Sequence, residues 1–372
     1  MNIKPLLEEM KILGASDLHL KVGSPPIYRI DGELRRVAME PLTFDDVEAI
    51  VHENITKDRE KRLLDEENQV DFAISLPGVA RFRANVHRQR GSLAMTFRIV
   101  PYIIPSLEAL NLPPILRELA LRPRGLVLVT GTVGSGKSTS LASMIDVINS
   151  TKNVKVITIE DPIEFLHTDK KGLVIQREIG SDTTSFGSAL KHILRQDPNV
   201  ILIGEIRDVE TMSIALTAAN TGHLVLTTLH TIDATQTINR IISFFPIHQH
   251  QEVRFLLASC LMSVISLRLV RRSDEHGRVP AVEVMITTAA IREYLMDAEK
   301  LHLIKTAISE GVVEYGMQSF DQALMKLYKE GTITFEEAMH NCSNPTEFDL
   351  RVRGIEATTD NTWSLFEGGG GR

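Results

Sequence analysis

One short stretch, GTVGSGKST at residues 131–139, constrains the fold more than any other part of the chain. It follows an apolar run, GLVLVT, and precedes a helical pattern, LASMIDVINS. Gly131, Gly136, Lys137 and Ser138 satisfy the pattern G-x-x-x-x-G-K-[ST] in the strand–loop–helix context of a phosphate-binding loop. The glycines let backbone N–H groups point at phosphate oxygens, and the helix adds the positive end of its dipole. The stretch therefore predicts a nucleotide site in an α/β domain.

The loop also predicts the cofactors, ATP and Mg2+. Lys137 is placed to reach the β- and γ-phosphates, and the Ser138 hydroxyl is placed to ligate Mg2+. The residues expected to surround the nucleotide are Gly131, Thr132, Val133, Gly134, Ser135, Gly136, Lys137, Ser138 and Thr139.

Two apolar runs downstream end in acidic residues. VKVITI ends in Glu160 and Asp161, with Glu164 just beyond, and NVILIG ends in Glu205, followed closely by Arg207. In an open α/β sheet, ligands collect at the carboxyl ends of the strands, so these carboxylates are expected to face the loop. A carboxylate there can hold Mg2+-bound water or orient the attacking water, and Glu205 is the candidate near the metal. Acids also simply solvate strand ends, but two such strands after a phosphate-binding loop favour an ATPase.

A third run, TGHLVLTTLHT, brackets an apolar strand with His223 and His230. At this odd spacing the two side chains would face opposite ways in one extended strand, so at most one faces the nucleotide. His230, at the carboxyl end, is the candidate, because a histidine there can donate to a γ-phosphate. A structural histidine at a strand end is the alternative.

These runs, in this order after GTVGSGKS, closely resemble the Asp box, Walker B box and His box of the type II/IV secretion ATPase superfamily. The segment SDLHLKVGSPPIYRIDGEL looks like that family's PAS-like N-terminal domain. AAIREYL, with Ala290, Ile291 and Arg292 as its core, resembles the AIRNL-type motif of the type IV pilus retraction ATPases, the PilT branch. Glu293-Tyr294 departs from the Asn-Leu of many relatives. The resemblance covers about residues 1–345.

Two further features favour the retraction branch. Many extension and type II secretion ATPases carry a four-cysteine zinc element, and this chain has only Cys260 and Cys342. Those relatives also typically carry a further N-terminal domain, which we do not expect here.

The expected fold class is α/β. The resemblance implies a PAS-like α+β domain at 1–100, followed after a linker at 101–114 by a RecA-like P-loop domain at 115–345 and a mobile tail at 346–372. The P-loop domain should have a mostly parallel sheet and a helical C-terminal part, because strand and helix patterns alternate from Ile115 on.

Local patterns add detail. Asp31-Gly32 predicts a hairpin, and Thr43 is a plausible N-cap of the helical stretch that follows it. Residues 250–272 are predicted to form a single core helix that ends in Arg268, Arg271 and Arg272.

The resemblance implies a homohexameric ring with ATP at the subunit edges, powering pilus retraction and twitching motility through an inner-membrane pilus platform protein. Phosphoryl transfer usually needs an arginine on the developing charge, often supplied in trans. Arg81 and Arg83 alternate with Phe82 and so project from one strand face, and Arg195 is a further candidate. The alternative for the arginine pair is a solvated strand face.

Composition disfavours several other functions. The chain has 41 Lys+Arg against 48 Asp+Glu, and aromatic residues are 5% of it, so a nucleic-acid translocase is disfavoured. We find neither a secretory signal nor an apolar run of about 18 residues, and so expect no membrane insertion. The expected location is cytoplasmic, peripheral at the inner face of the inner membrane through the pilus machine. Two alternatives remain: an accessory retraction ATPase beside a paralogous principal one, or a nucleotide-gated switch with slow hydrolysis.

Overall fold

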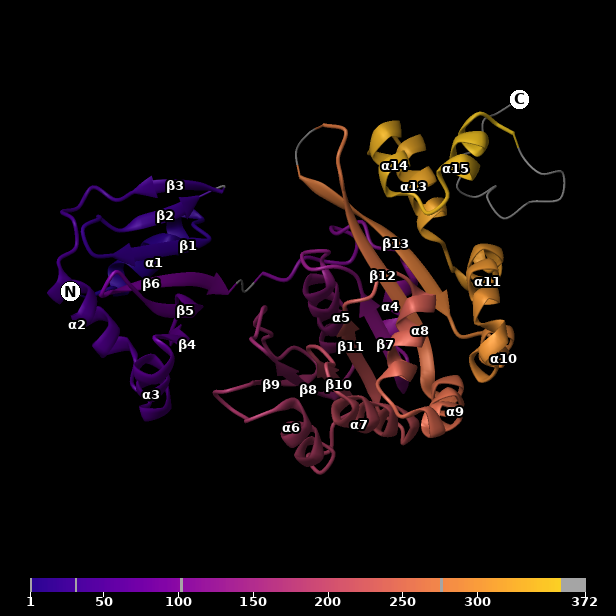
Figure 1. The fold of residues 1–372 in the computed structure, drawn as a ribbon, viewed down its shortest axis with the longest axis horizontal. Helices are drawn as coiled ribbons and strands as arrows, with labels where there is room; N and C mark the ends of the chain where they lie inside the picture. Colours follow the sequence, from indigo (N-terminus) through magenta and orange to yellow (C-terminus); the bar gives the residue numbers. More distant parts are fainter. Residues whose placement is uncertain (1, 31, 101–102, 275–276, 356–372) are drawn as a thin grey trace. The chain divides into compact units, whose positions relative to one another are not determined.

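The computed structural model describes residues 2–30, 32–100, 103–274 and 277–355. The chain divides into two compact units, one formed by Met1–Ile103 with Ile163–Leu166 and the other by Ile104–Pro162 with His167–Arg372. Figure 1 shows the elements of each unit, which are described separately below.

The N-terminal unit is an antiparallel sheet with helices on one face. The strand order is β3-β2-β1-β6-β5-β4, and its helices pack against the buried side chains of the sheet. The strands are β1 (Asp17–Lys21), β2 (Ile27–Ile30), β3 (Glu33–Arg36), β4 (Gln69–Leu76), β5 (Ala80–Gln89) and β6 (Ser92–Val100). The helices are α1 (Lys4–Leu13), α2 (Phe44–Asn54) and α3 (Asp58–Glu67).

Alternation along β5 shows why this sheet has one apolar face. Phe82 is fully buried, whereas Arg81 and Arg83 are only half-buried and project from the opposite face, as the spacing predicts. The predicted hairpin around Gly32 is also present, because β2 and β3 pair in antiparallel register.

The predicted helical stretch after Thr43 is two helices. Thr43 begins α2 with a capping box, in which its hydroxyl accepts from the Asp46 backbone N–H at 3.2 Å and Asp46 accepts from the Thr43 N–H at 2.9 Å. α2 ends at Asn54, and Ile55, its C-cap, has an extended backbone and a buried side chain. α3 then begins at Asp58.

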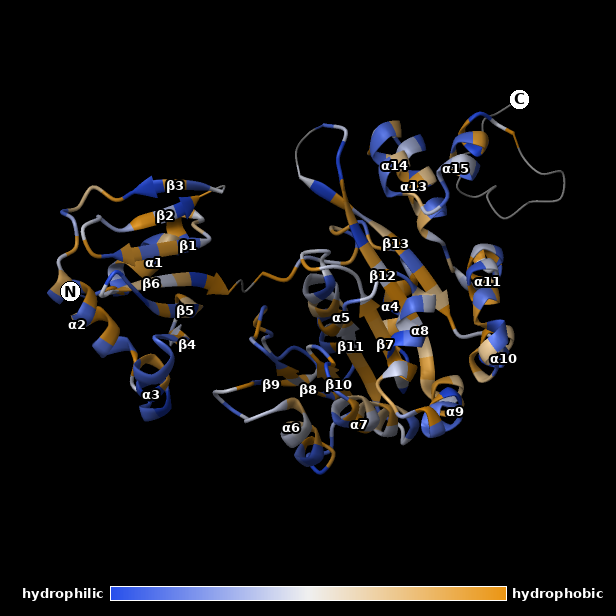
Figure 2. Ribbon diagram, in the orientation of Figure 1, coloured by the Kyte–Doolittle hydropathy of each residue, from blue (hydrophilic) through white to orange (hydrophobic). Residues whose placement is uncertain are grey.

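The second unit is built on a seven-stranded sheet of order β13-β12-β7-β11-β10-β8-β9, parallel except for β13. Its central strands are buried on both faces and accordingly read as nearly continuous apolar runs, as Figure 2 shows. The strands are β7 (Gly125–Thr130), β8 (Lys155–Glu160), β9 (Leu173–Glu178), β10 (Val200–Ile203), β11 (Leu224–Leu229), β12 (Leu261–Arg271) and β13 (Arg278–Ile286).

Helices cover both faces of this sheet, so the predicted α/β class is confirmed. One face packs on α4 (Ile115–Ala120) and α5 (Lys137–Thr151), together with Leu107 and Leu112 of the preceding segment. The other face packs on α6 (Phe186–Ile193), α7 (Val209–Asn220), α8 (Ala234–Ser243), α9 (His250–Cys260), α10 (Ala289–Met296) and α11 (Ile304–Glu310). Short helical turns are η1 (Ile247–Gln249), η2 (Ala298–Leu303) and α12 (Val312–Tyr315).

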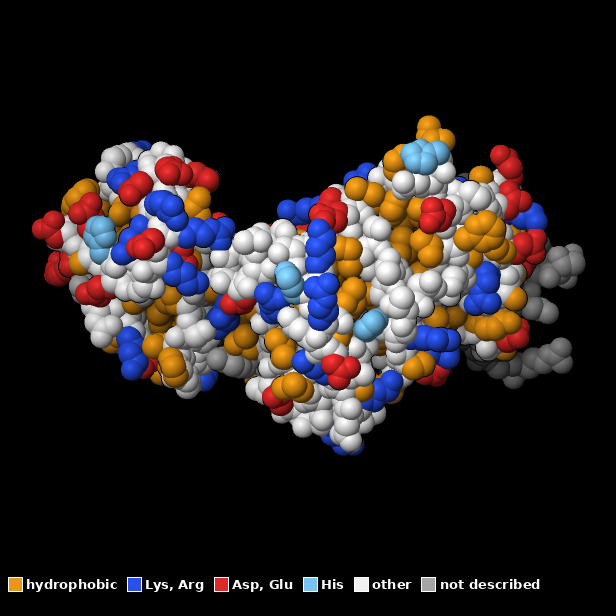
Figure 3. Space-filling model, turned by 90° about the horizontal axis from the view of Figure 1, so that it is seen from below, with side chains coloured by type: hydrophobic (Ala, Val, Ile, Leu, Met, Phe, Trp, Pro, Cys, Tyr) orange, Lys and Arg blue, Asp and Glu red, His pale blue; other side chains and the backbone are white. Residues whose placement is uncertain are grey.

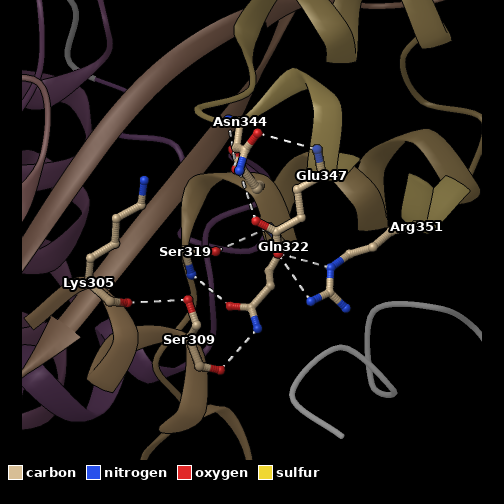
Figure 4. A network of polar contacts seen from close by, with 8 residues as sticks. Lys305, Ser309, Ser319, Gln322, Asn344, Glu347 and Arg351 are labelled. Atoms are coloured by element: carbon tan, nitrogen blue, oxygen red, sulfur yellow. Dashed lines mark hydrogen bonds and ion pairs between the residues drawn. The ribbon is translucent and has the colours of Figure 1, made fainter. Parts of the chain in front are cut away.

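Three C-terminal helices pack on the far ends of β12 and β13: α13 (Phe320–Lys329), α14 (Phe335–Asn341) and α15 (Pro345–Val352). Gln322 joins α13 to α11 by donating to the Ser309 carbonyl at 3.1 Å, and Arg351 pairs with Glu347 at 3.1 Å within α15 (Figure 4). Residues 346–355 therefore differ from the expected mobile tail, since Phe348 is buried. The rest of that tail, 356–372, lies outside the described residues.

The prediction of one helix over 250–272 is wrong beyond Cys260. α9 ends there, and β12 continues as a strand between β7 and β13. A strand buried on both faces is a continuous apolar run, which periodicity cannot distinguish from a buried helix. Arg268 consequently is not at a solvated helix end: its guanidinium lies 4.4 Å from the centre of the Phe320 ring and donates to the Asn341 carbonyl.

Within the described residues, every helix is too short or too polar to cross a bilayer. On the face seen in Figure 3, basic and acidic side chains occur side by side in each unit.

The alternation in β5 makes a prediction about stability. Phe82→Ala should lower the free energy of unfolding of the N-terminal unit by about 3–5 kcal/mol, because it leaves a cavity in the core. Phe44→Ala, in the same unit but 46% exposed, should cost less than about 1 kcal/mol. Denaturant titration followed by circular dichroism measures both, and similar losses would show that β5 does not bury Phe82.

Candidate functional site

Four neighbouring parallel strands end at one edge of the large sheet and place the predicted residues there. The order β7-β11-β10-β8 puts the loop 131–139 after β7, His230 after β11, Glu205 after β10 and Asp161 after β8. Because the strands are parallel in register, their carboxyl ends meet at the same edge. This edge is where an open α/β sheet binds its ligand.

The loop 131–139 is shaped by glycines and closed around a buried cation. Gly131 and Gly136 have φ values of 141° and 96°, a region that favours glycine. Lys137 is buried, and its ammonium donates to the carbonyl oxygens of Gly131 at 2.9 Å and Thr132 at 2.8 Å. Desolvation lowers the pKa of Lys137, and the negative charge of Glu205 opposes this shift. The loop thus holds a poorly solvated cation, which favours an anionic ligand.

The remaining loop residues also fit a phosphate ligand. The Ser135 hydroxyl is buried without a hydrogen-bond partner among the described residues. Thr132, Val133, Gly134 and Ser138 are exposed, and Thr139 lies half-buried in the first turn of α5. Ser138, at the exposed start of α5, is the hydroxyl that would ligate Mg2+ beside a bound triphosphate.

Glu205 is the centre of a second cluster. Its side chain is 16% exposed and forms an ion pair with Arg207, while its Oε2 lies 3.4 Å from Nε2 of His230. The hydrogen bond and the charge of Glu205, with a smaller contribution from Asp161, raise the pKa of Arg207. The Thr228 hydroxyl fixes the preceding turn by donating to the Gly204 carbonyl at 2.6 Å.

Glu205, Arg207 and His230 line a cavity of about 400 Å³, to which α8 contributes Arg240. Sequence reasoning missed Arg240, although it lies on the helix that follows the His230 loop. His223 is not part of this cluster, because its ring contacts the Ala218 carbonyl at the other end of β11. The structure therefore brings only His230 of the two histidines to Glu205.

The acids at and beyond the end of β8 lie in different surroundings. Glu160 is buried at the strand end, where it accepts hydrogen bonds from Thr158 at 2.6 Å and Gln176 at 3.1 Å. Asp161 is exposed at the start of the following turn. Glu164 is exposed and lies in the segment that groups with the N-terminal unit. Only Asp161 of the three has a resolved electrostatic effect on the Glu205 cluster, through Arg207.

Arg81 and Arg83 lie in the N-terminal unit, on the sheet face away from its helices. The register places Arg98 of β6 directly opposite Arg83, and Asp17 of β1 beside Arg98, with a hydrogen bond of 2.8 Å from Arg98 to Asp17. Sequence reasoning missed Arg98, since pairing it with Arg83 needs the strand register. Arg81 and Arg83 therefore share their sheet face with a third arginine, Arg98, whose charge is paired with Asp17.

The other predicted residues have clear places. Arg195 is exposed just after α6. In α10, Ala290 is exposed, Ile291 is fully buried in the core, and Arg292 donates to the Ala258 carbonyl of α9 at 2.9 Å. The segment 289–296 thus docks on α9 through two of its three central residues.

The glycines of the loop allow a matched test of the nucleotide site. A Cβ at Gly131 would lie 2.4 Å from the Leu267 carbonyl oxygen, whereas one at Gly134 would meet nothing within 4 Å. Gly131→Ala should therefore weaken nucleotide affinity at least roughly tenfold more than Gly134→Ala. Titration with a fluorescent nucleotide measures both affinities. Equal losses would mean that the close approach at Gly131 does not shape the site.

Comparison with known proteins gives consistent results. The model of the family described as "Type II/IV secretion system protein" matches residues 2–325. The Type IV pilus retractation ATPase PilT of Pseudomonas aeruginosa is 44% identical over 348 residues, which is 94% of this chain and 100% of that protein. The Type IV pilus ATPase PilU of the same organism is 40% identical over 369 residues, covering 99% of this chain and 96% of that protein.

Solved structures agree with the sequence relatives. The crystal structure of the pilus retraction motor PilT with bound ADP superposes with a TM-score of 0.86 at 45% identity, covering 93% of this chain and 98% of that one. The ATPase DotB of Legionella pneumophila superposes with a TM-score of 0.79 at 28% identity, covering 95% and 96% of the two chains. The chain belongs to the type II/IV secretion system protein family.

Proposed function

We propose that this chain is an ATP-hydrolysing motor that powers type IV pilus retraction, and with it pilus disassembly and twitching motility. The observation that carries the proposal is the position of Glu205: it lies at the sheet edge that holds the loop 131–139, acts electrostatically on Lys137, and reaches His230 at 3.4 Å. The similarity to PilT, over nearly the whole of both chains, supports the same function.

Each of these groups has a task in the proposed mechanism. The loop N–H groups and Lys137 bind the β- and γ-phosphates, which exchange for the carbonyl partners of the ammonium. Ser138 and Glu205 would hold Mg2+, which neutralises phosphate charge when bound. Glu205 orients the attacking water and takes up its proton. As water attacks the γ-phosphorus, its bond to the β,γ-bridging oxygen breaks and ADP leaves. His230, beside Glu205, donates a hydrogen bond to the γ-phosphate during this step.

Glu160, Asp161 and Arg207 have supporting places in this proposal. Glu160 is held by Thr158 and Gln176, so it stabilises the end of β8. Arg207 restrains the Glu205 carboxylate through their ion pair. The negative charge of Asp161 also favours the charged form of Arg207. Glu164 stays a candidate catalytic carboxylate; it lies in Ile163–Leu166, the segment that groups with the N-terminal unit.

We propose that the active species is a homohexameric ring in which arginines reach the nucleotide of a neighbouring subunit. Arg81 and Arg83 are the candidates, with Arg195 as a third, because phosphoryl transfer is accelerated by a guanidinium on the developing charge. Their placement on the face of the sheet that points away from the core of their own unit supports delivery to another chain.

The proposed partners follow from the retraction function. The ring acts on the inner-membrane pilus platform protein and so is cytoplasmic and peripheral to that membrane. A paralogous retraction ATPase is a further candidate partner, because the chain is 40% identical to PilU over 99% of its length. The same similarity supports the second candidate function, an accessory retraction ATPase that works beside a principal one. A slow nucleotide switch is distinguished from both by its turnover rate.

Mixing two inactive variants tests the proposed ring. Glu205→Gln removes the residue that orients water, and Arg81→Ala/Arg83→Ala removes the trans guanidinium groups, so each alone should lose at least roughly a hundredfold in kcat. In mixed rings, a site with Glu205 from one chain and the arginines from another is complete, and hydrolysis should return in part.

The readout is steady-state ATP hydrolysis, with light scattering to follow assembly. Arg35→Ala, an exposed arginine of the same unit, is the control and should leave kcat unchanged. If the two inactive variants never complement each other although mixed rings form, the arginines do not act in trans.

The two histidines provide a second test within the site. His230→Ala should lower kcat roughly tenfold to a hundredfold with little change in nucleotide affinity, since its hydrogen bond acts mainly in the transition state. His223→Ala, at the opposite end of β11, should stay within about twofold of the wild type. Comparable losses in kcat would remove His230 from the proposed mechanism.

A further inference from the structure

Three buried polar side chains form a row across the sheet beside the phosphate-binding loop. Thr130 ends β7, and the strand registers pair it with Ser266 of β12 and pair Ser266 with Glu283 of β13. Paired residues of adjacent strands project from the same face. Their exposed fractions are 0%, 0% and 5%, and the Thr130 hydroxyl donates to that of Ser266 at 3.0 Å. The row begins immediately before Gly131.

The row ends at the first turn of α8. A carboxylate oxygen of Glu283 accepts the backbone N–H of Ala234 at 2.9 Å, and Ala234 is fully buried. Asp233, the N-cap, accepts a second N–H of this turn, from Gln236 at 2.7 Å. Glu283 thus satisfies a helix-terminal donor from another strand rather than from the helix's own sequence.

The start of α8 in turn fixes the loop that carries His230. Only residues 230–233 join β11 to α8, so this connection is short. The Thr231 hydroxyl is 2.6 Å from that of Thr237, which ties the loop to the second turn of the helix. Because the connection is short, we expect a displacement of Ala234 to move His230 relative to Glu205.

The Ala234 N–H does not require a charged acceptor. A single N–H could be satisfied by a neutral acceptor, whereas a buried charge carries a desolvation cost. Burial raises the pKa of Glu283 to about 7, against the lowering effect of the Ala234 hydrogen bond. Of the charged groups that face it, Asp233 raises the pKa further, while Lys305 of α11 and Arg268 of β12 lower it.

We propose that Glu283 is a positioning residue for the His230 loop, and that its carboxylate holds the start of α8 against the row that leads to the phosphate-binding loop. This inference rests on the proposed ATP hydrolysis. The ionised carboxylate binds the positive end of the α8 dipole more strongly than the neutral acid does. Deprotonation therefore orders the His230 loop and favours hydrolysis.

Ionisation of Glu283 also lowers the free energy of unfolding. Because the folded-state pKa of Glu283 lies above its ordinary value of 4.5, this group stabilises the fold most below about pH 4.5. That contribution decreases as the pH rises and is lost through about pH 7. A neutral substitute should therefore be as stable as the wild type, or more so, above pH 7.

The test compares full-length wild type, Glu283→Gln and Glu283→Ala by steady-state ATP hydrolysis and by amide exchange of residues 230–238. Ser263→Ala is the control, because Ser263 is also a buried polar residue, on β12. Its hydroxyl donates to the Met285 carbonyl at 2.7 Å and not to α8. Glu283→Ala should lower kcat roughly tenfold, with KM for ATP within about twofold, and should speed exchange at 230–238. Ser263→Ala should do neither.

The glutamine variant tests the charge. The ratio of wild-type kcat to Glu283→Gln kcat should rise roughly threefold to tenfold between about pH 6 and pH 8, with a midpoint near 7. A ratio that is constant with pH would overturn the role of the charge, and Glu283→Ala behaving like Ser263→Ala would overturn the positioning role.

If Glu283→Ala does not fold, the pH dependence of the glutamine ratio decides alone. If the wild type does not hydrolyse ATP, the proposed function fails, while the exchange rates of the glutamine variant and the control still report whether Glu283 holds the start of α8.

Discussion

The parallel order β7-β11-β10-β8 is the constraint on which the site depends, because it forces four loops from distant parts of the sequence to one edge of the sheet. Each strand is buried on both faces and has little freedom to shift its register. The loops themselves are exposed and polar and can accept a ligand. In this way a rigid apolar sheet fixes the distances between a cation, a carboxylate and a histidine.

At this edge of the sheet, partly buried positive and negative side chains offset one another's charge. Lys137 is desolvated inside its loop, and the charge of Glu205 offsets part of that cost. Glu205 is in turn paired with Arg207 and lies near His230. A bound triphosphate would replace the two carbonyl contacts of Lys137 with an ion pair. Because Glu205 interacts with the charge of Lys137, binding can also reorganise the Glu205 cluster. Glu283, on the edge strand β13 two strands from β7, is proposed to link the loop strand to the His230 connection through its hydrogen bond to Ala234.

Much of this arrangement follows from local sequence patterns. The loop 131–139, the acids at strand ends and the placement of His230 are encoded within short segments whose context is unambiguous. Arg98 and Glu283 were not predicted, because their importance arises from strand register, which a single sequence does not reveal. Residues 261–271 were predicted as helix because a fully buried strand and a buried helix share one composition. Residues 346–352 were expected to belong to a mobile tail, and with Pro345 they form α15.

The central claim is that hydrolysis belongs to an assembly in which two chains complete each site. The most direct measurement is the rate of ATP hydrolysis per chain across a dilution series, with light scattering recording the mass of the assembly at each concentration. The per-chain rate should fall toward zero as the ring dissociates into single chains, while each single chain still binds nucleotide through Lys137 and its loop. Single chains that hydrolyse ATP at the full rate would contradict the claim.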